Sequence, residues 1–330
     1  MRAGFGAVSL FFVLSTAALA QAPAPKPACD RACLEGYMDR YLKAMLDRDV
    51  SDALFARNVR FTENGIQLPL GDEGLWWGMS GLGGYRFYVP DVETQQVAMI
   101  GTVKENMGNH GVNDDQGTNV AVAIRLKIVD GKITEIEQLA IRPPVQLGGP
   151  GRGGRGGAAG AGGRGPAPST GDRVAAMGKP NPIFSEVIPE NERASRDDLI
   201  QSANYYFTGL ARHDGNGYYP FTTDCVRYEN GFETTNDCLK QFTGHSLDNI
   251  VNRIRDRRFV AVDRERGIVF SFAFFDHYRI NWTWQLAELF KIEKGKIRRV
   301  EAVFHQAPFG IPSGWSPYEQ SIGEEIQSIR

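Results

Sequence analysis

The chain contains the same sequence pattern twice, and this repeat most limits the folds open to it. FARNVRFTENG at 55–65 aligns without a gap with FTTDCVRYENG at 221–231. DGKITEIEQL at 130–139 aligns in the same way with KGKIRRVEAV at 294–303. Because the two copies keep the same order in a chain of 330 residues, they indicate a duplicated domain.

Each copy predicts a helix followed by strands. Apolar residues at three- and four-residue spacing predict an opening helix at 34–49 and again at 197–214. The Asn-Gly pair of each ENG sequence predicts a turn, because both residues tolerate positive φ. Alternating runs around Asp-Gly at 119–141 and around Lys-Gly at 281–306 predict a closing β-hairpin in each copy. A helix followed by a strongly bent antiparallel sheet is the layout of an α+β cone.

The two ends and the middle of the chain differ in composition from the repeats. Arg2, the apolar run at 8–14 and Ala18-Leu19-Ala20 are typical of a signal peptide cleaved before Gln21. The glycine-rich stretch at 148–171 predicts a flexible linker, with an RNA-binding RGG segment as the less favoured alternative. We therefore expect a signal peptide at 1–20, a first domain at 28–147, a Gly/Pro/Arg linker at 148–180, a second domain at 181–318 and a C-terminal tail at 319–330.

The four cysteines all follow the expected signal peptide. Local pairing of Cys29 with Cys33 and of Cys225 with Cys238 is the simplest of three connectivities. Metal binding is the alternative, but no histidine stands at ligand spacing from either pair. We expect two disulfides and a secreted or periplasmic protein.

Both halves resemble the nuclear transport factor 2-like superfamily, which includes SnoaL-like polyketide cyclases, and in particular a secreted subgroup with two such domains. The resemblance rests on the opening helix with its Tyr-Leu pair and Asp ending, the F-x-x-x-V-R-[FY] strand and the G-K-I-x-x-[IV]-E hairpin, and it spans about 32–143 and 195–310. It implies an α+β fold of two cone-shaped domains, each a strongly bent antiparallel sheet wrapped around N-terminal helices. It also implies an apolar pocket in each cone, with an Asp, His or Tyr acting as acid or base.

Four residues of the second half are candidate catalytic groups. His305 aligns with Ile141, so this histidine is particular to the second copy, and Glu301 lies on the same face of its strand. Asp276 and the adjacent His277 must face opposite ways on a regular strand, so at most one enters a given pocket. The expected catalytic residues are His305, Asp276, Glu301 and Tyr228.

A further set of polar and aromatic residues is expected to bind substrate: Tyr206, Glu229, His277, Trp282, Trp284, Glu288, Glu63 and Trp76. Alternatives remain for several of them. The two glutamates of the ENG turns could bond only to nearby backbone amides. Trp76 could be a hydrophobic plug beneath a long loop, and the tyrosines could be ordinary packing residues.

These residues support two hypotheses of function. The first is a cofactor-independent lyase, dehydratase or isomerase that uses general acid/base chemistry on a small aromatic or polyketide-like molecule. The second is an exported module that binds a small molecule or a protein without catalysis. No nucleotide or three-ligand metal motif stands in the sequence, so we expect no cofactor.

The charge and composition of the chain limit the kinds of partner that we expect. A formal net charge of -2 provides no bulk field for nucleic acid, and we expect no membrane contact after signal cleavage. The basic stretch RIRDRR at 253–258 is interpreted as a salt-bridged helix end. The expected partners are a small hydrophobic molecule and either a second copy in a homodimer or the other domain of the same chain.

Overall fold

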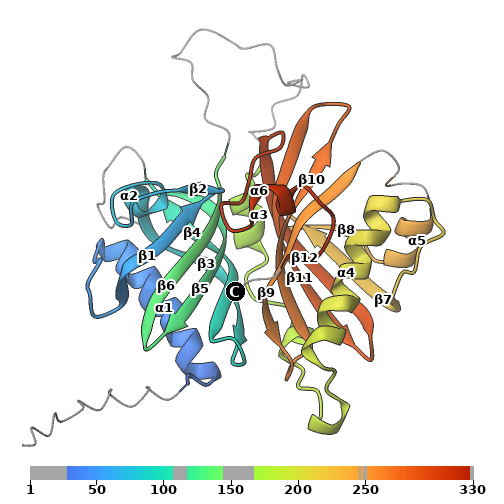
Figure 1. Ribbon diagram of the computed structural model, residues 1–330, viewed down its shortest axis with the longest axis horizontal. Coiled ribbons are helices and arrows are strands. Elements are labelled where there is room, and N and C mark those ends of the chain that lie inside the picture. Colours follow the sequence, from blue (N-terminus) through green and yellow to red (C-terminus); the bar gives the residue numbers. More distant parts are fainter. Residues whose placement is uncertain (1–27, 107–116, 144–166, 245–246, 248–250, 328–330) are drawn as a thin grey trace, which may run out of the picture.

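The computed structural model of the chain describes residues 28–106, 117–143, 167–244, 247 and 251–327. The expected signal peptide and most of the expected linker lie outside these residues. The first domain follows the order shown in Figure 1: α1 (Arg31–Asp47), β1 (Phe55–Glu63), β2 (Ile66–Gln67), α2 (Leu75–Gly78), β3 (Met79–Asp91), β4 (Gln96–Glu105), β5 (Thr118–Val129) and β6 (Lys132–Ile141).

The second domain repeats this order after a short connecting region. The connection contains α3 (Thr170–Ala176), η1 (Pro182–Ser185) and η2 (Glu190–Glu192). The domain itself consists of α4 (Arg196–Arg212), β7 (Phe221–Glu229), β8 (Phe232–Thr235), α5 (Cys238–Thr243), β9 (Arg253–Asp263), β10 (Ile268–His277), β11 (Trp282–Glu293), β12 (Lys296–Pro308) and a last short helix, α6 (Tyr318–Ser321).

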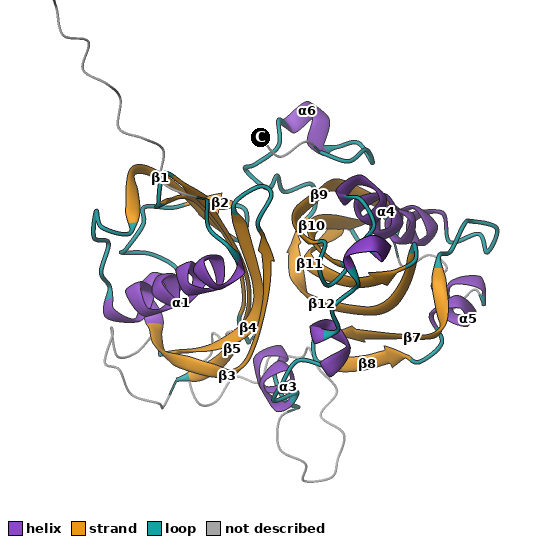
Figure 2. Cartoon of the chain, turned by 90° about the horizontal axis from the view of Figure 1, so that it is seen from below, coloured by secondary structure: helices purple, strands orange, loops and turns teal. Residues whose placement is uncertain are grey.

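The two six-stranded sheets have the same strand order, β2-β1-β6-β5-β4-β3 and β8-β7-β12-β11-β10-β9. Figure 2 shows each sheet curved around its long helix, α1 or α4. We call the concave side of each sheet, together with this helix, the first and the second cone. Both sheets are mixed rather than purely antiparallel, because β1 pairs with β6, and β7 with β12, in parallel. This corrects the expected antiparallel sheet.

The long helices begin and end with equivalent local signals. Asp30 and Ser195 cap their first turns, each side chain accepting a bond from the backbone N–H three residues on. Arg48 and His213 end them in the left-handed conformation, with φ of 57° and 33°. The predicted helices are confirmed, as are both predicted hairpins.

The repeated ENG sequence is explained by its asparagine. Asn64 and Asn230 have φ of 51° and 50°, and the glycines that follow them are also in the positive-φ region. Each asparagine side chain reaches the strand that comes last in the chain within its sheet, β6 or β12. There its amide group donates to the backbone carbonyl of one residue and accepts from the backbone N–H of the same residue. Asn64 pairs in this way with Ala140 at 3.1 and 2.8 Å, and Asn230 with Phe304 at 3.1 and 2.9 Å. The turn therefore fastens the β1–β2 and β7–β8 ribbons to the sheet in both copies.

The convex faces of the two sheets pack against each other (Figures 1 and 2). One hydrophobic cluster contains residues of both sheets and of the connecting region, and its largest members include Tyr85, Phe87, Phe184, Phe270 and Phe272. The two domains thus share a core that neither could bury alone.

Two glutamates at corresponding positions cross this interface. Glu137 of β6 accepts bonds from Nη1 of Arg258 in β9, at 2.7 and 2.6 Å. Glu301 of β12 accepts a bond of 2.8 Å from the hydroxyl of Tyr85 in β3, and one of 2.7 Å from Arg299 Nε. All these side chains are buried, so the carboxylates are paired where water is excluded.

The C-terminal segment after β12 returns to the first domain. Trp315 Nε1 donates to Thr62 Oγ1 at 2.8 Å, and the guanidinium groups of Arg60 and Arg125 lie 4.3 and 4.6 Å from the centre of the indole ring. The expected tail then packs on the second domain, because Gln327 N donates to the carbonyl of Arg257 in β9 at 2.8 Å.

Two further expectations differ from the structure. The stretch at 253–258 is not a helix end, because it forms the start of strand β9. Within the range expected to be linker, α3 is a capped helix whose Val174 is buried in the interface. Gly171 of α3 approaches the Asn119 backbone so closely that an added Cβ would lie 2.0 Å from its carbonyl oxygen.

The buried Glu137–Arg258 pair should contribute strongly to stability. We expect Glu137→Gln to lower the free energy of unfolding by about 3 kcal/mol, because Arg258 then stays buried with only Asp256, 3.3 Å from its Nε, as a counter-charge. The matched control is Glu93→Gln, which breaks the exposed pair with Arg264 (2.8 Å) and should cost less than about 1 kcal/mol. Urea unfolding of both variants tests this, and equal losses would contradict it.

Candidate functional site

The second cone holds a buried glutamate with a free oxygen. Glu288 lies on β11, on the face that carries the cone residues Leu286 and Phe290, and it is 1% exposed. Its Oε2 has no hydrogen-bond partner among the residues that the structure describes. Burying a polar atom without a partner is unfavourable, so this group is a candidate for function.

An arginine and a tyrosine stand beside Glu288. Arg227 of β7 donates from Nε to the hydroxyl of Tyr206 in α4 at 2.7 Å. It also donates to Gln241 Oε1 of α5 at 2.9 Å and forms an ion pair with Glu229. We call Glu288, Tyr206, Arg227 and Glu229 the acid cluster.

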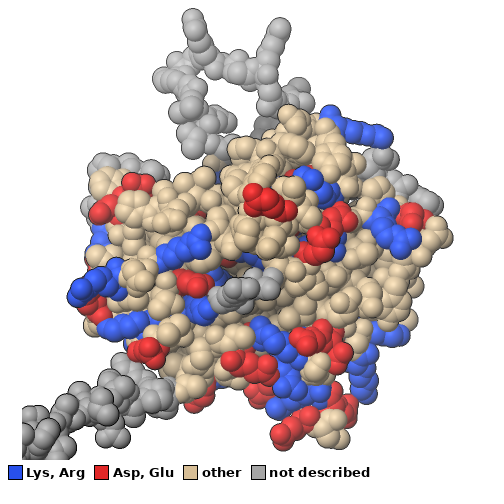
Figure 3. All heavy atoms as spheres, viewed as in Figure 1, with Lys and Arg blue, Asp and Glu red and all other residues tan. Residues whose placement is uncertain are grey.

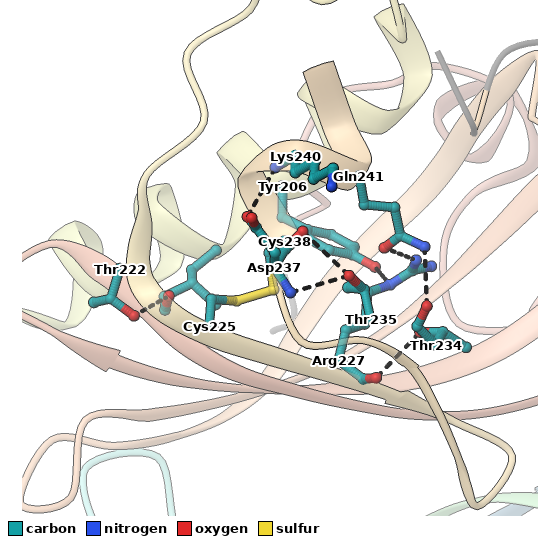
Figure 4. Close-up of a disulfide and its surroundings, with 11 residues drawn as sticks. Tyr206, Thr222, Cys225, Arg227, Thr234, Thr235, Asp237, Cys238, Lys240 and Gln241 are labelled. Atoms are coloured by element: carbon teal, nitrogen blue, oxygen red, sulfur yellow. Dashed lines mark hydrogen bonds between the residues drawn. A yellow bond between two sulfur atoms is a disulfide. The ribbon is translucent and has the colours of Figure 1, made fainter. Parts of the chain in front are cut away.

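The Cys225–Cys238 disulfide fixes the outer side of this cluster. It joins β7 to α5, and Figure 4 shows Gln241 of α5 and Tyr206 both directed at Arg227. Since α5 has only six residues, it is too short to be stable as an isolated helix. The crosslink therefore holds Gln241 against the guanidinium. Both predicted disulfides, Cys29–Cys33 and Cys225–Cys238, are present.

Burial keeps Glu288 protonated near neutral pH. Desolvation raises the pKa of its carboxyl from 4.5 to about 8. The Arg227 guanidinium and the Tyr206 hydroxyl oppose this rise, and the Glu229 carboxylate adds to it. The cluster thus contains a carboxylic acid that can donate a proton and a cation that stabilises the resulting carboxylate.

A second group of polar atoms lies further along the concave face. His277 and Trp282 are opposite each other in the last pair of β10 and β11. The His277 ring is 4.3 Å from that of Trp284, which stacks on Phe304 at 4.9 Å. Neither His277 Nε2 nor Trp282 Nε1 has a partner among the described residues. Desolvation lowers the pKa of His277, so its ring is neutral at neutral pH.

The first cone has the same architecture with different contents. The counterpart of Arg227 in the first domain is Phe61, because Phe61 pairs with Ile136 as Arg227 pairs with Val300. The counterpart of Glu288, judged by its pairing with the following strand, is Ile124. Apolar residues therefore replace Arg227 and Glu288, whereas Glu229 keeps a glutamate, Glu63, as its counterpart.

The polar groups of the first cone are bonded to one another. Tyr41 donates to Gln138 Oε1 at 2.9 Å and accepts from Trp76 Nε1 at 3.2 Å. Glu63 accepts from Leu75 N at 2.8 Å and from Gln138 Nε2 at 2.9 Å, and it pairs with Arg142 at 2.8 Å. Trp76 is fully buried against Tyr41, as expected of a plug. Glu63 bonds to a backbone amide, although to that of α2 rather than of its own turn.

The four expected catalytic residues lie outside the second cone. Glu301 bonds to Tyr85 of the first domain, and the His305 Nε2 atom on the same face is 3.2 Å from Oε1 of Gln285 in the neighbouring strand β11. Asp276 also lies on the convex face, bonded by Arg253 and Arg255 at 2.9 Å each and by Thr283 at 2.7 Å. Tyr228 donates to Glu233 at 2.9 Å on an exposed edge. The structure does not bring these four together in one pocket.

Their placement has two physical causes. A register shift between Ile297 and Arg299 in β12 changes the face that the following residues occupy, so Ile297 lies in the second cone and Glu301 in the interface. The convex face is also covered by the other domain, so it carries buried apolar residues as the cone does. Alternation correctly separates Asp276 from His277, but it does not tell which side is concave.

Arg227 is the member of the acid cluster that the repeated sequence motif did not predict. The letters Val-Arg recur in both copies, but Arg60 stands three residues before its Glu-Asn-Gly and Arg227 only two. Because strand residues alternate, this difference sends the two arginines to opposite faces. Arg60 stacks on Trp315 outside, whereas Arg227 points inward. The number of residues between each arginine and its Glu-Asn-Gly turn, rather than the shared Val-Arg pair, indicates which arginine points inward.

Other kinds of site receive less support from the described residues. No group of three His, Cys, Asp or Glu side chains there could hold a metal ion. None of the helices in the described part of the chain is long and apolar enough to cross a membrane. On the face drawn in Figure 3, acidic and basic side chains are interspersed. The two disulfides suggest an oxidising compartment.

Fold and site together define a tandem α+β protein in which only the second described cone contains the acid cluster. The family model named domain of unknown function DUF8021 matches at 28–140 and again at 192–304, so the chain belongs to this family. The match is to DUF8021 and not to a SnoaL-like family. No curated protein matches the sequence.

Solved structures with some similarity each cover about one domain. They include a de novo designed protein with a curved β-sheet (16% identity, TM-score 0.27, 34% of this chain and 88% of that one). Another is an LEH-like epoxide hydrolase of M. tuberculosis (14%, 0.28, 33% and 84%). A third is a protein of unknown function with a cystatin-like fold from Methylobium petroleophilum PM1 (14%, 0.28, 35% and 80%). Scores this low carry no argument about activity.

The raised pKa of Glu288 predicts a pH-dependent stability. Between pH 4.5 and about 8 the folded protein holds a proton on Glu288 that the unfolded chain releases, so stability falls as pH rises. Relative to Glu288→Gln, the wild type should lose about 1.4 kcal/mol of unfolding free energy per pH unit in this window. Urea unfolding at pH 5, 6, 7 and 8 measures it. An exposed control that keeps Glu288, Glu93→Gln, should lose stability with rising pH as the wild type does, and parallel curves for wild type and Glu288→Gln would contradict the assignment.

Proposed function

We propose that the second domain is a cofactor-independent enzyme that transfers protons within a small hydrophobic molecule, as a lyase, dehydratase or isomerase. The observation that supports this most is the buried Glu288 carboxyl, whose Oε2 has no partner among the described residues. A carboxyl in this state is stable only as the acid or when a ligand completes its bonding.

The acid cluster provides the steps that such a reaction needs. Protonated Glu288 donates its proton to a carbonyl or leaving hydroxyl oxygen of the substrate. The resulting carboxylate is stabilised by the Arg227 guanidinium. Because the Tyr206 hydroxyl already accepts the Arg227 Nε bond, its own hydrogen remains available for the carboxylate. The carboxylate then takes a proton from the neighbouring carbon, whose C–H electron pair forms a C=C bond. A protonated hydroxyl thereby leaves as water when its C–O bond breaks, and a protonated carbonyl becomes an enol.

The surroundings of the cluster suit a hydrophobic substrate. Phe207, Phe275 and Phe290 surround it with ring-to-ring distances of 5.7 to 5.8 Å, and all are buried. Apolar walls exclude water and strengthen the charge interactions of Glu288 and Arg227. We further propose that the protein is exported, since the disulfides agree with the expected signal peptide.

A non-catalytic binding module is the second candidate. It is favoured by the same aromatic walls, which could hold a hydrophobic ligand without transforming it. The two candidates differ in what happens to the ligand. A substrate leaves the cone chemically changed, and a simple ligand leaves it intact.

The test combines ligand discovery with a matched pair of variants. Aromatic and polyketide-like molecules that raise the melting temperature of residues 21–330 are incubated with the protein and examined by mass spectrometry. For a molecule that is converted, we expect Glu288→Gln to lower turnover at least 100-fold while retaining binding, because the amide cannot donate the same proton.

The control is His305→Ala, which alters the only expected catalytic histidine of the sequence analysis but not the second cone. We expect its turnover to stay within about twofold of the wild type. Unchanged turnover in Glu288→Gln would refute the proposed role of the cluster. Ligands that all return intact would favour the binding module.

A further inference from the structure

The far end of the second cone carries polar atoms that the proposed proton transfer does not use. His277 and Trp282 are the last residue pair of β10 and β11, and their ring centroids are 6.0 Å apart. The His277 side chain is 5% exposed and packs edge-on against Trp284. The site is thus walled by three aromatic rings.

Two atoms in this site lack partners among the described residues. His277 Nε2 can donate or accept a hydrogen bond, and Trp282 Nε1 can only donate. Buried polar groups of folded proteins are normally hydrogen-bonded, and two neighbouring exceptions on one concave face indicate a missing partner. An oxygen atom that accepts from the indole and bonds to the imidazole would satisfy both.

The distance to the acid cluster sets the length of the ligand. Glu288 lies four residues along β11 from Trp284, whose ring contacts that of His277, and six residues from Trp282. At about 3.3 Å per residue these separations correspond to about 13 and about 20 Å along the strand. A ligand that reaches both ends must therefore be elongated, and the aromatic walls between them favour a flat one.

Resting on the proposed function of the acid cluster, we propose that the substrate of the second cone is an elongated aromatic molecule with an oxygen at each end. One oxygen meets Glu288, and the other binds to His277 and Trp282. The latter pair forms a specificity subsite, which we call the distal subsite, and it holds the end of the molecule that does not react.

Two stilbenes that differ by one hydroxyl group test this directly. 4,4′-Dihydroxystilbene carries an oxygen at both ends, whereas 4-hydroxystilbene carries one. Isothermal titration of the full mature chain should give a Kd about tenfold lower for the dihydroxy compound, the effect of two added hydrogen bonds. In the double variant His277→Phe, Trp282→Phe, which keeps aromatic rings but removes the nitrogen atoms, the ratio should fall below about twofold.

Matched controls separate this inference from the function of the cluster. Tyr278→Phe removes a hydroxyl from the adjacent exposed turn and should leave the tenfold ratio unchanged. Glu288→Gln should also preserve the ratio, because it leaves the distal subsite intact. Equal affinities of the two stilbenes for the wild type, an unchanged ratio in the double variant, or no binding of either compound would overturn the distal subsite. Loss of the catalytic role of Glu288 would instead appear as unchanged turnover in Glu288→Gln with the ratio retained.

Discussion

The packing of the two sheets against each other is the constraint on which the rest of the structure depends. It buries the convex face of each sheet, and the concave face is already buried by a helix. Strand β10 shows the result, because all ten of its residues are buried. A strand covered on both sides must be apolar on both sides. The charged residues that remain there, such as Glu137 and Arg258, are paired across the interface.

This double burial also explains how the duplicated domains came to differ. The two convex faces must remain complementary to each other because they are in contact, and Glu137 and Glu301 occupy corresponding positions on them. The concave faces carry no such mutual requirement. In the first cone Phe61 and Ile124 are apolar, and Tyr41 and Gln138 satisfy each other. Changing only the two apolar positions to Arg227 and Glu288 introduces a cation and an acid beside a tyrosine that both copies have.

Local features of the fold could be predicted from the sequence, and the faces of the strands could not. Helix caps, Asn-Gly turns and hairpins depend on a few neighbouring residues, so α1, α4 and the β5–β6 and β11–β12 hairpins were predicted closely. The side of a strand that faces a cone depends on bulges and on the partner domain. His305 and Glu301 were therefore assigned to a pocket although they lie in the interface. His277, Trp284 and Glu288 share a strand face with their predicted neighbours because no bulge interrupts the pairing of β10 with β11.

The side chains of the acid cluster are held in place by a disulfide and by packed helices as well as by their own hydrogen bonds. Arg227 is two residues from Cys225, whose disulfide fixes α5, and its guanidinium is held by Tyr206, Gln241 and Glu229. In the first domain Val59 stands in place of Cys225, and the corresponding helix α2 contributes the Trp76 plug instead. A guanidinium fixed before a ligand arrives needs no reorganisation when Glu288 ionises, which is the condition under which a buried charge pair favours proton transfer. The crosslink and the acid cluster are therefore parts of one arrangement, and the described first cone has Val59, Phe61 and Ile124 at the positions of Cys225, Arg227 and Glu288.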